Sequence, residues 1–175
     1  MILYRHADPR FPFLWESAGQ PPARWHGTGE GPVQYFADTP DGAWAEFVRH
    51  EGITNEAELV NVRRALWAIQ VPDELPTGTP RLAVPVLTGG TATYDACRRE
   101  ARRLRAKSQR ALRAPSAALL PGGATGWVVD GGLQPAAQRD GFVIAVFGPQ
   151  PAFVGWMTAF AARPRSDLPS RVRYL

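Results

Sequence analysis

The segment from Arg24 to Glu46, RWHGTGEGPVQYFADTPDGAWAE, places the strongest constraint on what this chain can fold into. Its run PVQYFA, residues 32–37, predicts a strand. Thr39 then offers a helix N-cap, and Pro40 suits the first position of a helix. The spacing of the next apolar residues predicts a helix whose buried face carries Ala43, Trp44, Phe47 and Val48. A strand that leads directly into a capped helix favours a fold with both α and β elements.

The rest of the chain predicts short strands mixed with helices. Residues 8–32 are rich in proline and glycine and indicate a long loop. Further strands are predicted at 1–5, 64–71, 81–87, 116–120, 126–130, 142–147 and 171–175. Further helices are predicted at 55–62, 91–112 and 151–162. Few strand–helix–strand units occur, and no repeat or linker divides the chain, so we expect one α+β domain over residues 1–175 with short mixed strands and flanking helices.

Composition and cysteine content restrict the class of protein. The chain is 45% hydrophobic and 21% charged, as is usual for a soluble globular protein. No window approaches eighteen apolar residues, and the start MILYRHADPRF is too polar for a secretory signal, so we expect no membrane association and a cytoplasmic location. The one cysteine, Cys97, excludes an internal disulfide and a cysteine-based metal cluster. The histidines lack the spacing of a zinc helix, and we expect neither a metal nor another cofactor.

A basic run at residues 98–113 contributes much of the net charge of +4. It indicates a solvated helix face, a docking surface for an acidic partner, or phosphate contacts to nucleic acid. No nucleic-acid motif accompanies it and no aromatic residue interrupts it, so direct nucleic-acid binding is not expected. The basic residues are Arg98, Arg99, Arg102, Arg103, Arg105, Lys107, Arg110 and Arg113.

The segment from Arg24 to Glu46 also carries the candidate chemistry, in Arg24, Tyr35 and Glu46. An arginine can grip a diphosphate with two parallel hydrogen bonds. A tyrosine can stack on a planar ring, and a carboxylate can stabilise an oxocarbenium-like sugar. Each residue has an ordinary structural explanation when taken singly, but together they suit a nucleotide sugar. The glycines at 27, 29 and 31 lack the GxGxxG spacing, and a phosphate-binding P-loop motif is absent, so a Rossmann dinucleotide site is not expected.

Four motifs in order resemble the RES domain, a family named for its Arg, Glu and Ser. The first is the opening LYR with Arg5, and the second is RWH with Arg24. The third is the run GPVQYFADTPDGAWAE, which ends at Glu46, and the fourth is LRAPSAALLP, which supplies Ser116. The resemblance is strongest over residues 1–120.

The resemblance implies an ADP-ribosyltransferase-like fold with a cleft for NAD as substrate. It implies a toxin that depletes NAD by phosphorolysis or hydrolysis, with inorganic phosphate as a potential co-substrate. The partner would be an Xre-type antitoxin protein, and the family also suggests a homodimer. Carried over by residue, Arg24 would bind the diphosphate or orient the attacking group, and Arg5 would be a second anion contact. Tyr35 would stack near the nicotinamide, Glu46 would favour the cationic transition state, and Ser116 would position the substrate.

Two alternatives remain open at this stage. The first keeps the same site but transfers ADP-ribose from NAD to a protein target, as a mono-ADP-ribosyltransferase. The second is a non-enzymatic binding module that uses the basic segment 98–113 to dock an acidic partner or nucleic acid. The products formed from NAD separate the first alternative from NAD breakdown, and a lack of nicotinamide release favours the second.

Overall fold

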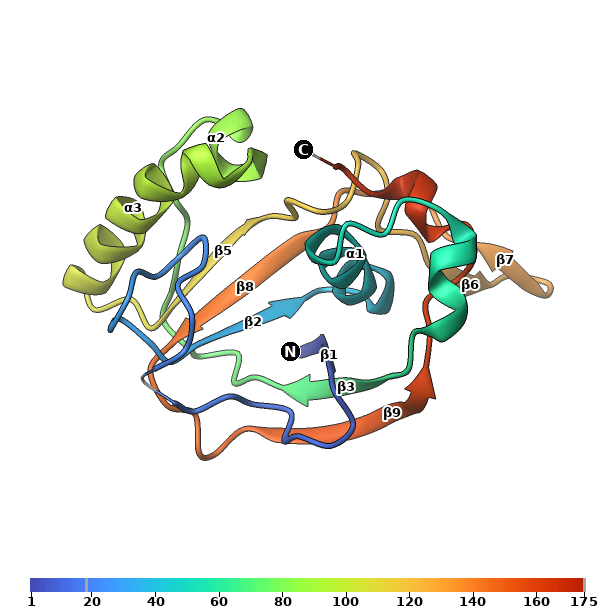
Figure 1. Ribbon diagram of the computed structural model, residues 1–175, viewed down its shortest axis with the longest axis horizontal. Coiled ribbons are helices and arrows are strands. Elements are labelled where there is room, and N and C mark those ends of the chain that lie inside the picture. Colours follow the sequence, from blue (N-terminus) through green and yellow to red (C-terminus); the bar gives the residue numbers. More distant parts are fainter. Residues whose placement is uncertain (18, 175) are drawn as a thin grey trace.

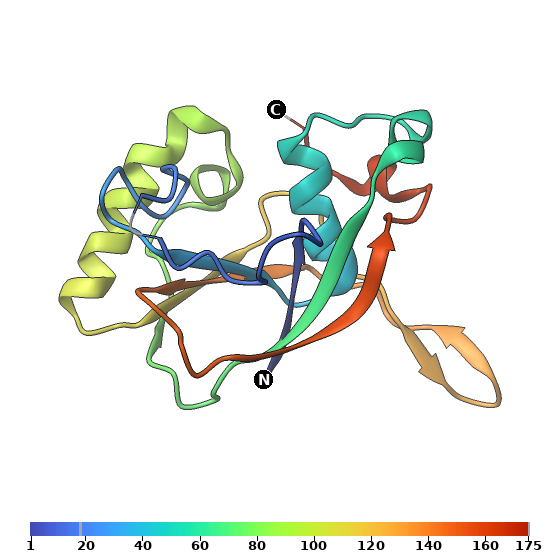
Figure 2. The same cartoon turned by 60° about the horizontal axis from the view of Figure 1, so that its bottom comes forward.

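The computed structural model describes residues 1–17 and 19–174, and its centre is a twisted seven-stranded sheet in the order β4-β5-β8-β2-β1-β3-β9 (Figure 1). A separate hairpin, β6–β7, projects from the body of the molecule (Figure 2). The strands are β1 Ile2–Ala7, β2 Val33–Ala37, β3 Arg64–Gln70, β4 Thr77–Gly78, β5 Ala111–Pro115, β6 Trp127–Val129, β7 Leu133–Pro135, β8 Phe142–Phe147 and β9 Val154–Ala162.

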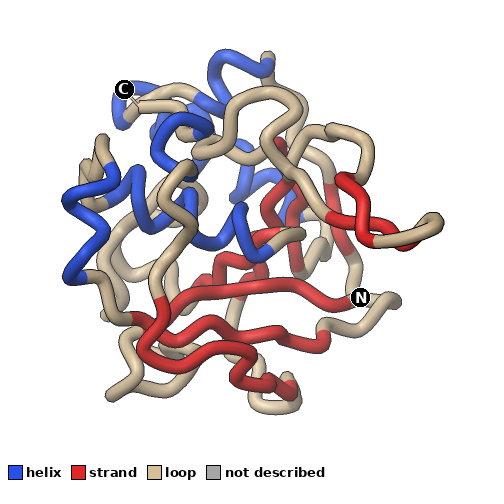
Figure 3. Tube along the Cα trace, turned by 90° about the vertical axis from the view of Figure 1, so that its right-hand side faces the viewer, coloured by secondary structure: helices blue, strands red, loops and turns tan. Residues whose placement is uncertain are grey.

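The helices gather on one side of this sheet, as Figure 3 shows in blue against the red strands. The α-helices are α1 Pro40–His50, α2 Val84–Thr88 and α3 Tyr94–Ala106. Short 3-10 helices are η1 Glu56–Asn61, η2 Thr91–Thr93 and η3 Leu168–Arg171. The expected α+β class is therefore confirmed. Within the described residues, no helix combines the length and the apolar character needed to cross a bilayer.

The two halves of the sheet meet at a narrow contact. Strand β1 pairs with β2 through Tyr4 and Ala37 alone, whereas the ladders β1–β3 and β2–β8 run the length of their strands. All neighbours are antiparallel except β4 and β5. A short ladder constrains the angle between two strands weakly, and the sheet turns sharply here (Figure 2). Two sheet segments of different direction are thus available to support α1 and α3.

Three buried apolar clusters hold the layers together. One lies under α1, where Trp44 and Phe47 pack with Leu66 of β3 and Leu168 of η3. A second lies under α3 and includes Trp25, Cys97, Leu104, Leu112 and Phe147. The third is on the opposite face of the sheet and includes Leu3, Leu14, Phe36, Ile69 and Ile144. Alternation along each strand sends neighbouring side chains to opposite faces, so the sheet is covered by apolar groups on both sides.

The start of α1 has the predicted cap. The buried Thr39 hydroxyl accepts a hydrogen bond from the Gly42 N–H at 3.0 Å, and Pro40 begins the helix. The helix ends at His50, and Gly52 follows with φ +66°, a conformation that glycine adopts without steric cost. Helix η1 has the predicted capping box between Asn55 and Glu58. These local signals position α1, which carries Glu46.

Removing the α1 cap is expected to lower the free energy of unfolding. Thr39→Ala leaves the Gly42 N–H without its side-chain acceptor, which costs about 1 kcal/mol. Urea denaturation followed by far-UV circular dichroism measures this loss. Thr54→Ala removes the same atoms at an exposed position and serves as the control. Equal midpoints for the two variants would contradict a stabilising cap.

Two predicted elements between residues 81 and 120 are wrong, and a third, the helix, is confirmed but shorter than predicted. Residues 81–87 were expected to be a strand, but Val84–Thr88 is helix α2, with Pro85 in its first turn where no N–H is needed. The helix predicted over 91–112 ends at Ala106, and Ala111–Pro115 is strand β5 beside β8. Ser108 has a positive φ of 59° and separates the two elements. The strand predicted at 116–120 is a turn, apart from an isolated bridge between Leu119 and Val172.

The C-terminal part also differs from expectation. Residues 151–162 were predicted as a helix, but Val154–Ala162 is strand β9, which pairs along β3. Its apolar residues lie on an edge strand beside β3, so pairing outweighs the weak periodicity. Residues 171–174 do not form the predicted strand, because Arg171 ends η3 and the following residues lie beside the turn after β5. Leu175, the end of that prediction, lies outside the described residues.

Candidate functional site

Arg24 lies just before β2 with its side chain turned toward the segment between α2 and α3. It is only 8% exposed. Its Nη2 donates to the Gly89 carbonyl oxygen at 2.6 Å, and its Nη1 donates to Thr93 Oγ1 at 3.3 Å. The guanidinium carbon stands 4.7 Å from the centre of the Tyr94 ring. Arg24 is thus held by backbone, hydroxyl and aromatic groups, and no carboxylate of the described residues contacts it directly.

Tyr35 fixes the segment that carries Arg24. Its hydroxyl accepts from the Trp25 N–H at 3.1 Å and contacts His26 Nδ1 at 2.9 Å. The other ring nitrogen of His26 lies 2.9 Å from the Pro21 carbonyl, which can only accept, so Nε2 carries the proton and Tyr35 donates to Nδ1. Burial lowers the pKa of His26 and raises the pKa of Tyr35, which keeps both neutral. Stacking of the Tyr35 ring on nicotinamide stays a prediction.

Glu46 and Ser116 are brought together from distant parts of the chain. Ser116 Oγ donates to Glu46 Oε1 at 3.3 Å, across from helix α1 to the turn after β5. The same hydroxyl accepts from the N–H groups of Ala118 and Leu119 at 3.2 and 3.1 Å. These two backbone donors fix the rotamer of Ser116, so the serine presents its proton to the carboxylate.

Burial and nearby positive charges act on the pKa of Glu46 in opposite directions. Burial raises the pKa of its carboxyl group, while the nearby guanidinium groups of Arg49 and Arg24 and the Ser116 hydroxyl favour the charged form. A carboxylate with this environment is available for charge stabilisation while it remains poorly hydrated. The pair Arg24 and Glu46 is therefore linked by charge, although no direct contact joins them.

Arg49 is a member of the site that the sequence analysis missed. It lies on α1 one turn after Glu46, and its Nη2 donates to the same Gly89 carbonyl oxygen as Arg24, at 3.1 Å. Its Nη1 donates to the Ala117 carbonyl oxygen. The spacing of three residues from Glu46 places both side chains on one side of the helix and was a usable signal.

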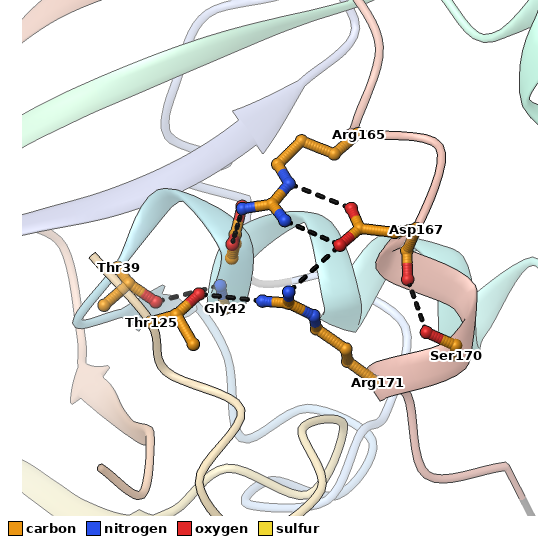
Figure 4. A network of polar contacts seen from close by, with 8 residues as sticks. Thr39, Gly42, Thr125, Arg165, Asp167, Ser170 and Arg171 are labelled. Carbon is orange, nitrogen blue, oxygen red and sulfur yellow. Dashed lines mark hydrogen bonds and ion pairs between the residues drawn. The ribbon is translucent and has the colours of Figure 1, made fainter. Parts of the chain in front are cut away.

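The C-terminal segment supports the Ser116 turn and the start of α1. Arg173 Nη1 lies 3.3 Å from the carbonyl oxygens of both Ser116 and Ala117. Figure 4 shows how Arg165 and Arg171 both reach Asp167, and how Arg171 also donates to Thr125 beside the N-terminus of α1. Two apolar residues of this segment, Leu168 and Val172, join the core under α1.

Arg5 lies apart from the other predicted site residues. It donates to the Gln34 side chain, and the charge of Glu16 acts on it. Gln34 is next to Tyr35 on β2, so the two side chains point to opposite faces of the sheet. Burial lowers the pKa of Arg5 to about 10. Among the described residues, Arg5 interacts with Gln34 and Glu16 rather than with Arg24, Glu46 or Ser116, and its assignment to an NAD site stays a prediction.

The basic helix α3 holds the glycine-rich loop in place. Arg98 Nε donates to the Ala23 carbonyl at 2.9 Å, and Arg102 Nε lies 2.6 Å from Glu30 Oε1. Arg105 reaches the Glu30 carbonyl at 3.2 Å. These contacts connect α3 to the loop that contains Arg24 and precedes β2. Three arginines of the basic run therefore have a structural use that none of the sequence interpretations included.

No group of three or more His, Cys, Asp or Glu side chains stands in a metal-binding arrangement within residues 1–17 and 19–174. Two open hollows occur near the N-terminus, lined in part by Met1, Asp73 and Glu74 or by Met1, Leu75 and Arg113. Neither is lined by the predicted site residues. The candidate chemistry is where Arg24, Arg49, Glu46 and Ser116 converge, with the segment around Gly89 closing over the two arginines.

The fold and the site together define an α+β protein whose candidate chemistry is carried by arginine, a glutamate with a buried carboxyl group and a serine. The RES domain family model matches residues 2–154, and the chain belongs to the RES domain family. The match extends beyond residue 120, where the resemblance was expected to fade, and includes β8 and the hairpin. RES domains are associated with NAD-related toxin activity in toxin–antitoxin systems and have antitoxin partners there. A search of curated proteins found none that matches this chain.

Proposed function

We propose that this protein cleaves the N-glycosidic bond between nicotinamide and ribose in NAD. The observation that carries the proposal is the convergence of Arg24, Glu46 and Ser116. Ser116 hydrogen-bonds Glu46, and the charge of Arg24 acts on that carboxylate. These are the three residue types after which the family is named, and they meet on the helical side of the sheet.

The chemistry of the bond suits these groups. Nicotinamide leaves as a neutral molecule from a cationic ring, so its departure needs no proton donor. Positive charge develops on the ribose as the bond breaks, and a preorganised carboxylate such as Glu46 lowers the energy of that state. Arg24 would grip the diphosphate with its planar donor pair and hold the ribose beside the carboxylate.

The acceptor of the ADP-ribosyl group is inorganic phosphate or water. In either reaction the C1–N bond breaks with its electron pair on nicotinamide, and an oxygen of the acceptor bonds to C1. Phosphate yields ADP-ribose 1-phosphate, and water yields ADP-ribose with release of a proton. The arginine-rich surroundings of Glu46 favour an anionic acceptor such as phosphate. In the cell, such a reaction would deplete NAD in the cytoplasm until an Xre-type antitoxin neutralises the toxin.

Product analysis tests this function directly. The protein is incubated with NAD in buffers with and without phosphate, and nicotinamide, ADP-ribose and its phosphate are separated by chromatography. We expect nicotinamide release with one of the two ADP-ribose products in equal amount. Labelled NAD added with a cell lysate tests the alternative of protein ADP-ribosylation, which predicts labelled protein bands. NAD that survives at every protein concentration would overturn the proposal.

The rate of NAD cleavage is expected to fall on the acid side with an apparent pKa above 4.5, the ordinary value for glutamate. Burial raises the pKa of Glu46, so the active carboxylate form is lost at a higher pH than usual. The measurement is kcat/KM for NAD from pH 4 to 8 with phosphate saturating throughout.

The contribution of Glu46 to the free energy of unfolding should fall as the pH rises, whereas its contribution to the rate of NAD cleavage should increase. Because Glu46 binds its proton more tightly in the folded than in the unfolded protein, its contribution is present below 4.5 and lost as the pH rises through the raised pKa. Glu46→Gln removes this ionisation, so the variant should lose that part of the pH dependence of unfolding. In the profile of kcat/KM against pH, an acid limb with an apparent pKa at or below 4.5 would contradict the role of the buried carboxylate.

A further inference from the structure

Three guanidinium groups from distant parts of the chain form a row through shared acceptors. Arg24 and Arg49 both donate to the Gly89 carbonyl oxygen, at 2.6 and 3.1 Å. Arg49 and Arg173 both donate to the Ala117 carbonyl oxygen. The row therefore joins the loop before β2, helix α1 and the C-terminal segment.

The charges in this row are not balanced. The charges of Arg24 and Arg49 act on one carboxylate, that of Glu46, and the charge of Arg173 acts on Arg49, so three positive charges accompany one negative charge and leave two in excess. Within the described residues, none of the three forms an ion pair at 4.0 Å or less, and the acceptors of their hydrogen bonds are carbonyl and hydroxyl oxygens. Burial and the neighbouring charges of Arg24 and Arg173 lower the pKa of Arg49. Holding like charges together in a partly buried place is costly unless an anion binds there.

We propose that Arg24, Arg49 and Arg173 form a binding site for a phosphate oxyanion, with the Gly89 carbonyl oxygen standing where a phosphate oxygen binds. The identity of the natural ligand rests on the proposed function, whereas the binding of the anion does not. Arg173 lies beyond residue 154, where the family match ends, so this arm of the site belongs to a part of the chain outside the match.

The residue type and the charge excess both indicate phosphate. A guanidinium group presents paired donors that match phosphate oxygens, and three of them can surround one tetrahedral anion. A phosphate monoester carries about −1.5 to −2 near pH 7, close to the excess of positive charge. The diphosphate of NAD and free inorganic phosphate share this chemistry, so the experiment has to distinguish the two sources.

The segment around Gly89 would move when the anion binds. Its carbonyl now satisfies both Arg24 and Arg49, and a phosphate oxygen would replace it as the acceptor. A Cβ at position 89 would lie 2.6 Å from Thr93 Cγ2 and 2.7 Å from the Pro85 carbonyl oxygen, so glycine is needed for the present arrangement. Binding would therefore exchange one oxygen acceptor, the Gly89 carbonyl, for another on the anion.

Isothermal titration calorimetry tests the site without any turnover of NAD. The full chain is titrated with inorganic phosphate and, separately, with ADP-ribose, which carries the diphosphate but has no nicotinamide bond to cleave. The variants are Arg173→Gln, which removes the charge, and Arg173→Lys, which keeps it without the planar donor pair. Arg163→Gln removes the same charge from an exposed position of the same segment and is the matched control.

We expect Arg173→Gln to weaken the binding of at least one anion by about tenfold or more, as when one hydrogen bond to a charged group is lost. Arg173→Lys should recover part of that affinity, and Arg163→Gln should bind as the wild type does. A loss for phosphate alone assigns the site to the acceptor, and a loss for ADP-ribose assigns it to the dinucleotide.

Three results would overturn the site. These are wild-type affinity for both anions in Arg173→Gln, an equal loss in Arg163→Gln, or no binding of either anion to the wild type. Circular dichroism melts check each variant, and Arg173→Lys decides the matter if Arg173→Gln does not fold. A protein that binds phosphate through Arg173 but leaves NAD intact would refute the proposed function and keep the site.

Discussion

Glu46→Ala is expected to lower the turnover of NAD by at least about a hundredfold. The carboxylate is held beside Ser116 and near two arginines, and its charge would face the ribose as positive charge develops there. The loss of one preorganised electrostatic contact of this kind costs roughly 3–4 kcal/mol in the transition state. The measurement is kcat and KM for NAD by nicotinamide release, and the loss should appear mainly in kcat because the contact strengthens only as the bond breaks.

Three further variants define that result. Glu46→Gln keeps the shape and the acceptor for Ser116 but removes the charge, so it should lose nearly as much activity as the alanine variant. Arg24→Ala should lose a similar factor and also raise KM, because Arg24 would bind the diphosphate in the ground state as well. Glu51→Ala removes an exposed carboxylate just beyond α1 and should keep full activity. Full activity in a folded Glu46→Ala protein would contradict the role of Glu46 in stabilising the positive charge on the ribose.

The local elements around the site could be predicted because their signals are local. Thr39, Pro40 and the apolar spacing of α1 act within one turn of helix, and the capping box of η1 spans four residues. Strand β9 was mistaken for a helix because its sequence has no clean alternation. It forms because β3 offers an open edge for pairing, which is a tertiary effect that local preference does not contain.

The candidate site was predictable where a motif marks the residue. Arg24, Glu46 and Ser116 stand in recognisable surroundings, and the structure brings these three into one region. Arg49 lies outside the quoted motifs but shares a helix face with Glu46. Arg173 gives no such signal, since only the folded chain brings the C-terminal segment against the turn at Ser116.

The basic helix shows how composition can mislead about function. A run of arginines predicts a surface for acidic partners as readily as a solvated face. In the fold, Arg98, Arg102 and Arg105 instead hold residues 23–30, the loop segment that contains Arg24 and leads to β2. These three arginines of the basic run therefore position the loop that carries Arg24. The two arginines whose charges act on Glu46, Arg24 and Arg49, lie outside the run.

Trp44→Ala is expected to give the largest loss of stability, about 3–5 kcal/mol in the free energy of unfolding. Trp44 is 5% exposed and fills the core between α1, β3 and the C-terminal segment. Its ring lies 6.4 Å from that of His6 and 6.3 Å from that of Phe47. Small domains have only about 5–15 kcal/mol in total, so this variant should unfold at a much lower urea concentration.

The control for this loss is another tryptophan in a different environment. Trp127 lies on the projecting β6–β7 hairpin and is 61% exposed, so Trp127→Ala should change stability by less than about 0.5 kcal/mol. Far-UV circular dichroism is the suitable probe, because the chain has six tryptophans and their fluorescence would overlap. Equal urea midpoints for the two variants would mean that the packing under α1 does not hold this helix. Because α1 carries both Glu46 and Arg49, a destabilised Trp44→Ala protein should also lose NAD turnover at temperatures where Trp127→Ala retains it.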